Sequence, residues 1–555
     1  MNPFSILDRK NTVKELKETQ FDLLIIGGGI TGAGIALDAA SRGLKVALIE
    51  MQDYASGTSS RSTKLVHGGL RYLEHLEFNV VRKIGHERDV VYRNASHIVI
   101  PEKMLLPVVK DGSLGYFTSS IGLMLYDFLA GVKESEKRQM LSREETIARE
   151  PLLENDNLLG GALYYEYKTD DSRLTIEVIK KAHEYGATLL NYAQATDFIY
   201  SNETVCGVSV HDQLQDEQYE IKAKKIVNAT GIWTDELRKK DHSLKNKRLH
   251  ITKGIHIVVS KIRFHLNQAI YFDVGDNRMV FAIPRFDVVY IGTTDTNYDN
   301  DYFHPNVETD DIEYLLKAIN QIAPSAKLEL SDVESVWAGL RPLIHEDGKS
   351  PSELSRKDEI FHSDSGLISI AGGKLTGYRL MAKEVVDIIV KQIEKENQRN
   401  FKKCSSQSIQ LSGGEFDFKI NTPNIEAYAE KQYLESKSTG ISQADFSILF
   451  RRYGSNIHLI TQQAKTLLSK NIPASEVWIR AEVWYTIQYE MAYSLSDFFV
   501  RRTGMIHFFA KKIMPMLQIV ADEMQKELNW SDEVRLSQIE NFSHEYSSAT
   551  TSFIK

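Results

Sequence analysis

The chain has 555 residues, of which 42% are hydrophobic, 10% aromatic and 26% charged. That length predicts about three to five folding units or fewer large ones, and the aromatic content excludes a disordered chain. The net charge of -8 gives no reason to expect a nucleic-acid partner, and two cysteines, Cys206 and Cys404, cannot form a disulfide framework or a metal site. With no long uncharged apolar run and no secretory signal in the polar residues 1–20, the sequence predicts a soluble cytoplasmic protein.

Residues 21–50 predict one βαβ unit. Residues 21–26 form a short apolar run that ends in glycines, as in a strand buried on both faces. Residues 30–41 have helical spacing and stop at Gly43, and residues 45–50 form a second strand. A strand, a glycine turn, a helix and a strand within about 30 residues make a parallel unit.

Strand and helix patterns alternate up to about residue 400. A helix is predicted over 171–185 and a longer one over 376–396. The further predicted strands are 218–227, 254–259, 279–283 and 367–370. This alternation predicts an α/β or α+β architecture.

Helical spacing dominates after a polar linker at 397–415. It is clearest at 475–494 and 504–528, and it continues to residue 542. We therefore expect one unit at residues 1–400 and an all-α C-terminal domain at residues 401–555. The polar tail from Ser543 is expected to fray.

The turn between the first strand and helix has the GxGxxG spacing, with Gly27, Gly29 and Gly32 in the three positions. Gly27 permits a tight turn, Gly29 lets backbone N–H groups approach a pyrophosphate, and Gly32 allows the helix to pack closely on the strand. Glu50 ends the second strand, where its carboxylate can accept hydrogen bonds from ribose hydroxyls. The unit predicts a dinucleotide, either NAD or FAD.

Residues 57–72, GTSSRSTKLVHGGLRY, combine small hydroxyl residues with lysine, histidine and arginine. The segment resembles the flavin-contacting segment of the glutathione-reductase/D-amino-acid-oxidase class. Its second half is similar to that of FAD-dependent glycerol-3-phosphate dehydrogenases. Further matching blocks are 227–231, 253–256, 291–295, 339–342, 372–376 and 497–503. The resemblance covers nearly the whole chain, with one departure at Ile232, where the family pattern leads us to expect proline.

The resemblance implies FAD as cofactor and an FAD-binding α/β fold of that class, with an embedded antiparallel-sheet substrate domain and an all-α C-terminal domain. Gly372 and Gly373 end a strand and open a helix, so their N–H groups suit the flavin edge that gains negative charge on reduction. The expected cofactor contacts are Gly27, Gly29, Gly32, Glu50, Thr58, Ser59, Ser60, Lys64, Leu65, His67, Gly69, Ala229, Gly231, Gly373, Leu375 and Thr376.

The same resemblance implies glycerol 3-phosphate as substrate and dihydroxyacetone phosphate as product. A phosphate needs fixed cations, and arginine gives bidentate contacts. The positions that match the family's substrate pocket are Arg71, Tyr72, Arg341, Arg356 and Lys374. Arg341 and Lys374 are also expected to act in catalysis, whereas Arg356 could equally be a solvated surface charge.

Alcohol oxidation requires loss of the hydroxyl proton, and neutral imidazole suits that task because its pKa lies near working pH. His67, inside the flavin-facing segment, is our candidate for the base, and His256 is the reserve. Most histidines are structural, so either ring could instead belong to the core.

Two cysteines cannot hold an iron–sulfur cluster. The family resemblance implies a membrane quinone as electron acceptor. It also implies peripheral attachment to the inner face of the cytoplasmic membrane. Residues 116–132 and 498–516 are the two apolar candidates for that contact, and core packing is the alternative for each. The oligomeric state stays open, a homodimer included.

Four alternatives remain. A glycerol-3-phosphate oxidase shares the motifs but often has an added segment, and this chain shows none. An oxidase of the D-amino-acid-oxidase class does not need the set Arg71, Arg341 and Lys374, and a redox-inactive FAD-binding regulator leaves that set without a purpose. An NAD-dependent dehydrogenase leaves residues 57–72 and 371–376 unexplained.

Overall fold

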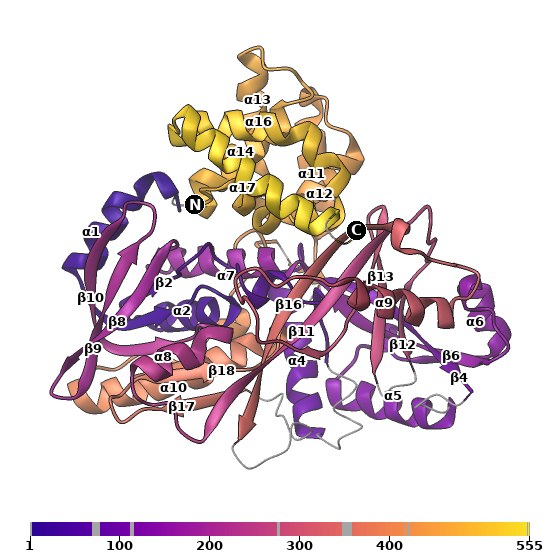
Figure 1. The fold of residues 1–555 in the computed structure, drawn as a ribbon, viewed down its shortest axis with the longest axis horizontal. Helices are drawn as coiled ribbons and strands as arrows, with labels where there is room; N and C mark the ends of the chain where they lie inside the picture. The colour runs from indigo at the N-terminus through magenta and orange to yellow at the C-terminus, as the bar shows by residue number, and fades with distance from the viewer. Residues whose placement is uncertain are drawn as a thin grey trace.

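The computed structural model describes residues 3–68, 78–110, 116–274, 278–346, 358–416, 418–419, 422–551 and 553. Two sheets lie side by side across the molecule, and the helices that follow residue 424 gather above them (Figure 1). The architecture is the α/β fold with a second sheet and a helical C-terminal region that the sequence predicted.

The first sheet has eight strands in the order β17-β18-β10-β1-β2-β7, extended by β8 and β9. The pairs among β18, β10, β1, β2 and β7 are parallel, which fits strands that are buried on both faces. Its strands are β1 (Gln20–Ile26), β2 (Val46–Ile49), β7 (Thr188–Leu190), β8 (Ala193–Ser201), β9 (Thr204–Asp212), β10 (Glu217–Asn228), β17 (Glu359–His362) and β18 (Ile368–Ala371). The predicted βαβ unit is confirmed as β1, α2 and β2.

Helix α2 (Ile30–Arg42) packs between α7 (Asp171–Glu184) and α10 (Tyr378–Asn397). Its residues are almost all buried, and Gly43 ends it with φ +95, the left-handed conformation that favours glycine. The predicted helices over 171–185 and 376–396 are thus confirmed as α7 and α10. All three helices cover the parallel sheet whose strand ends form the site described below.

The second sheet has ten strands in the order β15-β11-β14-β13-β12-β4-β6-β3, with β16 beside β11 and β5 beside β6. Its pairs are antiparallel except for β12 with β4. The strands are β3 (Leu65–Val66), β4 (Ile100–Val109), β5 (Gln139–Leu141), β6 (Leu158–Lys168), β11 (Lys247–Ser260), β12 (Ala269–Asp273), β13 (Met279–Arg285), β14 (Val288–Gly292), β15 (Thr296–Asn297) and β16 (Val333–Glu346). This sheet carries several of the residues expected at the substrate.

Further helices flank the sheets. Helix α1 (Arg9–Glu18) packs on β7 and β10, and α6 (Arg143–Arg149) packs on β6. Helix α4 (Phe78–Asn94) packs on α5 (Tyr116–Ala130), α8 (Thr234–Lys240) follows β10, and α9 (Thr309–Ile322) packs on β11. Among the described residues, none of the helices combines the length and the apolar character that a membrane span requires.

The C-terminal region is helical apart from the short pair β19 (Phe418–Lys419) and β20 (Thr422–Pro423). Its helices are α11 (Ile425–Ser436), α12 (Gln443–Tyr453), α13 (Ile457–Ser469), α14 (Val477–Glu490), the π-helix η12 (Asp497–Arg502), α15 (Met505–Phe508), α16 (Ala510–Leu528) and α17 (Asp532–Thr550). The expected fraying from Ser543 is wrong, because α17 continues to Thr550 and buries Phe542 against Phe499. Side chains of α14, η12, α16 and α17 share one apolar core with the parallel sheet, and the division at residue 400 stays a prediction.

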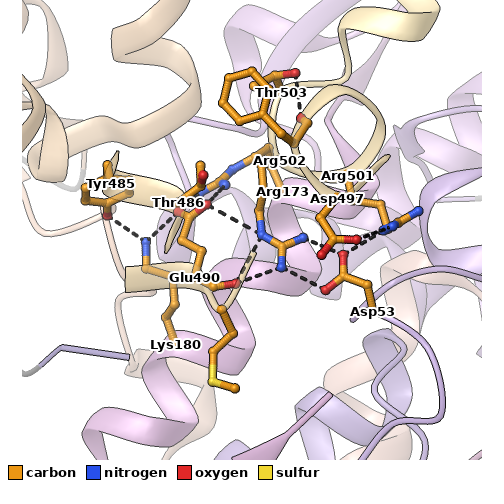
Figure 2. A network of polar contacts seen from close by, with 12 residues as sticks. Asp53, Arg173, Lys180, Tyr485, Thr486, Glu490, Asp497, Arg501, Arg502 and Thr503 are labelled. Atoms are coloured by element: carbon orange, nitrogen blue, oxygen red, sulfur yellow. Dashed lines mark hydrogen bonds and ion pairs between the residues drawn. The ribbon is translucent and has the colours of Figure 1, made fainter. Parts of the chain in front are cut away.

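A buried ionic network joins the C-terminal region to the parallel sheet (Figure 2). Asp53 Oδ2 accepts hydrogen bonds from Arg501 Nε and Arg502 Nη1, both at 2.6 Å, and Asp53 Oδ1 accepts one from Arg502 Nη2 at 2.8 Å. Glu490 accepts from both terminal nitrogens of Arg173 on α7, at 2.7 and 2.8 Å. These side chains are essentially excluded from water, so each charge depends on its partner.

This network also decides between the two interpretations for the first half of residues 498–516. Phe498, Phe499 and Val500 belong to the core, and the charges of Arg501 and Arg502 are neutralised by Asp53 inside the protein. The first half of that segment is therefore core, and it is not available to a membrane surface.

Candidate active site

The glycine turn after β1 makes a cradle that no larger residue would fit. Gly27 has φ +114, and a Cβ on it would lie 2.5 Å from the carbonyl oxygen of Ala229. A Cβ on Gly32 would lie deep inside van der Waals contact with the carbonyl oxygen of Gly27. Helix α2 begins at Ile30 directly after Gly29, so the first N–H groups of the helix face the end of the sheet.

Glu50 follows β2 beside this turn. Its Oε2 accepts a hydrogen bond from the backbone N–H of Gly28 at 2.7 Å, and its Oε1 accepts one from the N–H of Gln52 at 2.9 Å. Burial raises the pKa of Glu50, and the two backbone donors offset part of that effect. A carboxylate has about four acceptor positions, so two remain for a ligand.

These residues line an elongated pocket at the carboxyl ends of β1, β2, β10 and β18. In parallel sheets, ligands bind at this edge. The pocket brings together ten residues named from the sequence: Gly27, Gly29, Glu50, Thr58, Ser59, Ala229, Gly231, Gly373, Lys374 and Leu375. One pocket therefore collects segments that lie as far apart as residues 27 and 375.

Other lining residues were not expected. They include Ile30, Thr31, Gln194, Ala195 and Trp233. Trp233 stands directly after the block 227–231, so its position could have drawn attention to it. Gln194 and Ala195 begin β8 and carry no local signal in the sequence; they reach the pocket because β8 follows β7 at the edge of the sheet.

Six of the expected cofactor residues that the structure describes do not line the pocket: Gly32, Ser60, Lys64, Leu65, His67 and Thr376. Lys64 is buried, and its Nζ contacts Asp171 Oδ1 at 2.5 Å and the carbonyl oxygen of Ser60 at 2.9 Å. Leu65 is in the buried strand β3. The side chain of Lys64 therefore holds this segment against α7, and a role at the cofactor would fall to its backbone.

His67 and Thr376 are held together by two hydrogen bonds. The N–H of His67 donates to Thr376 Oγ1 at 3.0 Å, and the same hydroxyl donates to the carbonyl oxygen of His67 at 3.0 Å. Burial, with the positive charges of Lys374 and Arg88, lowers the pKa of His67 to about 3. The imidazole is therefore neutral, and it lies within the field of a lysine that lines the pocket.

Arg341 lies on β16, next to β11 and the loop after β14. Its Nη2 donates to Thr293 Oγ1 at 2.9 Å, and its Nη1 lies 3.3 Å from Asp295 Oδ1. Gly254 on β11 leaves the space for this guanidinium, since a Cβ there would overlap Nη2. About a third of the Arg341 side chain is exposed, so it can still meet a ligand.

His256 is buried in the second sheet. Its ring stacks on Trp337 at 4.6 Å, and its Nε2 lies 3.1 Å from Thr63 Oγ1. Burial and the charges of Arg341 and Lys64 hold its pKa well below the usual value. The ring is therefore neutral and tightly packed.

Two family models match the chain. One, for FAD dependent oxidoreductases, matches residues 22–379, and the other, the C-terminal domain of alpha-glycerophosphate oxidase, matches residues 404–535. An aerobic glycerol-3-phosphate dehydrogenase of Bacillus subtilis is 49% identical over 542 residues, which cover 97% of each chain. The chain belongs to the FAD-dependent glycerol-3-phosphate dehydrogenase family.

Solved structures agree with this family. A glycerol-3-phosphate dehydrogenase from Bacillus halodurans, complexed with FAD, superposes with a TM-score of 0.83 at 41% identity and covers 98% of each chain. An L-alpha-glycerophosphate oxidase from Mycoplasma pneumoniae has a TM-score of 0.56 at 18% identity, over 72% of this chain and 99% of that one, and shows the shared fold alone.

The residues of the pocket fit FAD, the cofactor of this family of glycerol-3-phosphate dehydrogenases. The cradle at Gly27 and Gly32 suits a pyrophosphate, and the free acceptor positions of Glu50 suit a ribose. At the other end Gly372 and Gly373 have φ +77 and +88, and the turn Leu375–Gly377 then leads into α10. These glycines let the backbone approach a flat ring closely.

Four of the predicted site residues lie outside the described residues: Gly69, Arg71, Tyr72 and Arg356. Their roles at the cofactor and the substrate stay predictions. The described part of the site thus contains the FAD pocket, with Lys374 on its wall and Arg341 beside its lining residue Pro342.

Proposed function

We propose that this chain oxidises sn-glycerol 3-phosphate to dihydroxyacetone phosphate and passes the electrons to a membrane quinone. The names of its relatives support the substrate. The single observation that carries the proposal is the position of Lys374, which lines the FAD pocket and lowers the pKa of His67. The wall of the pocket therefore carries a cation for a phosphate, and that cation acts electrostatically on a neutral imidazole that could take a hydroxyl proton.

In this proposal, different residues bind the phosphate and accept the hydroxyl proton. Arg341 and Lys374 bind the phosphate, and the family resemblance adds Arg71, Tyr72 and Arg356 to the same pocket. His67 takes the proton of the secondary hydroxyl at its unprotonated ring nitrogen. When bound, FAD would accept the hydride from the carbon atom that carries this hydroxyl. The dianionic phosphate offsets the field of Lys374 and so raises the pKa of His67, which makes the imidazole a stronger base in the complex.

Replacing His67 by glutamine is expected to slow flavin reduction by glycerol 3-phosphate by at least about 100-fold, because general-base catalysis contributes about that much. Anaerobic stopped-flow absorbance measures this rate directly. FAD content should not change, since only the backbone of His67 bonds to Thr376. The control His256→Gln alters the other candidate ring. A near-normal rate in His67→Gln would remove His67 from the role of base.

Membrane attachment is proposed through α5, from the first of the two candidate segments. Phe128 on α5 is 82% exposed and Met124 is 51% exposed, although Leu123 and Tyr126 on the same helix are buried. Lys133 follows directly and is about half exposed. An exposed apolar stripe beside a lysine, here paired with Asp89 at 3.3 Å, suits the surface of a bilayer. The inner face of the cytoplasmic membrane as the site of attachment is what the family resemblance implies.

Replacing Phe128 by aspartate is expected to weaken binding to anionic vesicles by about 10-fold or more, because burial of a phenylalanine side chain contributes about 1.5–3 kcal/mol. Quinone reduction in vesicles should fall with binding, and reduction of a water-soluble dye should not. The matched control is Ile262→Asp, at a site that is 96% exposed in a turn after β11. Equal vesicle binding by both variants would exclude α5 as the contact.

The acceptor is tested by following three quantities in one assay: dihydroxyacetone phosphate, reduced quinone and hydrogen peroxide. The proposal expects dihydroxyacetone phosphate and reduced quinone in equal amounts, with little peroxide. Steady peroxide release without quinone would instead support the glycerol-3-phosphate oxidase alternative, whose C-terminal domain model also matches.

A further inference from the structure

A second cavity, of about 220 Å³, lies where the C-terminal helices meet the end of the second sheet. One wall comes from the starts of β4 and α7 and the ends of β6 and β13, and the other comes from α12 and the turn around α15. The cavity shares no lining residue with the FAD pocket. It is smaller than the roughly 300–1,000 Å³ of pockets for drug-sized ligands, so it suits a small molecule.

The wall of this interdomain cavity is strongly cationic. Among its described lining residues Asp170 is the one carboxylate. The cations on the wall are Lys168, Arg173, Arg285, Arg451 and Arg452. Four of them have carboxylate partners: Lys168 pairs with Glu102 at 2.7 Å, Arg173 with Glu490 at 2.7 Å, Arg285 with Asp170 at 3.5 Å, and Arg452 with Glu482. The fifth cation, Arg451, has no such carboxylate partner among the described residues.

Arg451 has no hydrogen bond and no ion pair among the residues that the structure describes. It lies on the last turn of α12 and is partly buried. Burial lowers the pKa of Arg451, and the more distant charge of Glu426 and the ring of Tyr92 offset only part of this effect. Arg451 therefore lacks a protein partner among the described residues while keeping some contact with water, and an anion in the cavity would supply a partner for its charge.

His97, just before β4, is the second unpartnered group on the wall. It is completely buried, and neither Nδ1 nor Nε2 has a hydrogen-bond partner. Burial and the charges of Arg173, Lys180 and Arg451 hold its pKa well below the usual value, so the ring is neutral. A neutral imidazole has one donor and one acceptor, and leaving such groups unsatisfied costs about 1–3 kcal/mol each.

We propose that the interdomain cavity binds a small phosphorylated anion, with the guanidinium of Arg451 as its main cation. Arginine matches phosphate oxygens with two parallel hydrogen bonds. Phe286 and Phe508 on the wall provide an apolar surface for a short carbon skeleton. The shared chemistry is the phosphate group, carried either by inorganic phosphate or by a short phosphate monoester.

The position of the cavity links such a ligand to both halves of the protein. Its walls come from both sides of the junction, so occupancy favours the docked arrangement. Asp170 lines this cavity and the next residue, Asp171, lines the FAD pocket. Asp171 also holds Lys64, so the two pockets share one short segment of chain.

The test compares the FAD-bound unaltered protein with Arg451→Gln and with Lys465→Gln, which removes an exposed lysine from the neighbouring helix α13. In phosphate-free buffer, Arg451→Gln should melt at the same temperature as the unaltered protein or higher, since it removes an unpaired charge. Inorganic phosphate should raise the melting temperature of the unaltered protein and of Lys465→Gln, and raise that of Arg451→Gln much less.

Calorimetric titration with inorganic phosphate supplies the direct measurement. The unaltered protein should show a phosphate site that Arg451→Gln binds at least about 10-fold more weakly, as expected for a charged hydrogen bond worth about 1.5–3 kcal/mol. Arg451→Lys, which keeps the charge but loses the bidentate geometry, should lie between them and serves if the glutamine variant does not fold. The inhibition constant of phosphate against glycerol 3-phosphate should not change, because that competition occurs at the FAD pocket.

Glycerol 2-phosphate separates the two sources of the phosphate group. If glycerol 2-phosphate binds at the site assigned to Arg451 more tightly than inorganic phosphate does, the natural ligand is a monoester. If it binds more weakly, the natural ligand is free phosphate. The proposal is overturned if Arg451→Gln binds both probes with the stoichiometry and affinity of Lys465→Gln. It is also overturned if the unaltered protein binds phosphate only at a site that competes with glycerol 3-phosphate.

Discussion

Replacing Asp53 by alanine is expected to lower the free energy of unfolding of the FAD-bound protein by about 3–5 kcal/mol, because the change leaves buried charges without a partner. Asp53 is completely buried, and it joins the parallel sheet to Arg501 and Arg502 of the C-terminal region. It also lies three residues after Glu50, which lines the FAD pocket. Denaturant unfolding, followed by flavin fluorescence, measures both the stability and the release of FAD.

The matched control is Asp522→Ala. Asp522 pairs with Arg535 but is about half exposed, and an exposed pair contributes at most about 1 kcal/mol. The account expects a large loss for Asp53→Ala and a small one for Asp522→Ala. Equal losses in the two variants would mean that the buried network does not hold the C-terminal region in place.

The Asp53 effect has a definite pH dependence. Burial raises the pKa of Asp53, but Arg502 and Arg501 outweigh it and hold the pKa below the usual value. A lowered pKa in the folded state gives stability that is complete above the unfolded-state value of about 4 and is lost as the pH falls below it. The difference in stability between the unaltered protein and Asp53→Asn should therefore be largest at neutral pH and narrow below about pH 4.

Replacing Gly32 by alanine is expected to yield protein without FAD. The added Cβ would overlap the carbonyl oxygen of Gly27 and push α2 away from the turn that we propose as the pyrophosphate site. Because the obstacle is backbone, no side-chain rotation can relieve it. Visible absorbance of the purified variant, relative to its protein absorbance, measures the FAD content and should be at least about 10-fold below that of the unaltered protein, as for a loss of about 1.4 kcal/mol or more.

Gly122→Ala is the control for this change. A Cβ on Gly122, within α5, meets nothing within 4 Å, so alanine should leave the FAD content unchanged. Full FAD content in Gly32→Ala would show that the cradle at the end of β1 is not the pyrophosphate site.

The local parts of the fold could be predicted because their signals are local. The burial of residues 21–26, the spacing of Gly27, Gly29 and Gly32, and the stop at Gly43 each follow from neighbouring residues. Ten of the expected cofactor and substrate residues meet in one pocket because short blocks follow parallel strands, whose carboxyl ends share one edge.

Long-range contacts could not be predicted in the same way. Asp53 pairs with residues 448 and 449 positions away, and nothing near Asp53 in the sequence distinguishes it from a solvated loop carboxylate. Gln194 and Ala195 reach the FAD pocket only through the order of the strands. The pairing of Lys64 with Asp171 on α7 likewise joins residues that are distant in the sequence, and the role of Lys64 at the cofactor stays a prediction.

Tertiary packing also explains where the sequence misled. Residues 543–550 are polar and predicted a frayed tail, yet Phe542 and Tyr546 anchor α17 on the C-terminal core. For residues 498–516 the sequence left two interpretations open, because apolar and basic side chains suit both a membrane surface and a core with internal ion pairs. Only the carboxylate partner of Arg501 and Arg502 distinguishes the core interpretation from the membrane interpretation, and that partner, Asp53, lies far away in the sequence.

We expect glycerol 3-phosphate to reduce FAD held in the pocket that joins residues 27–32 to residues 372–375. The most direct test is the visible spectrum of the purified protein under anaerobic conditions, before and after glycerol 3-phosphate is added. The account predicts an oxidised flavin spectrum that bleaches on addition of the substrate. A colourless protein, or a flavin spectrum that glycerol 3-phosphate leaves unchanged, would contradict it.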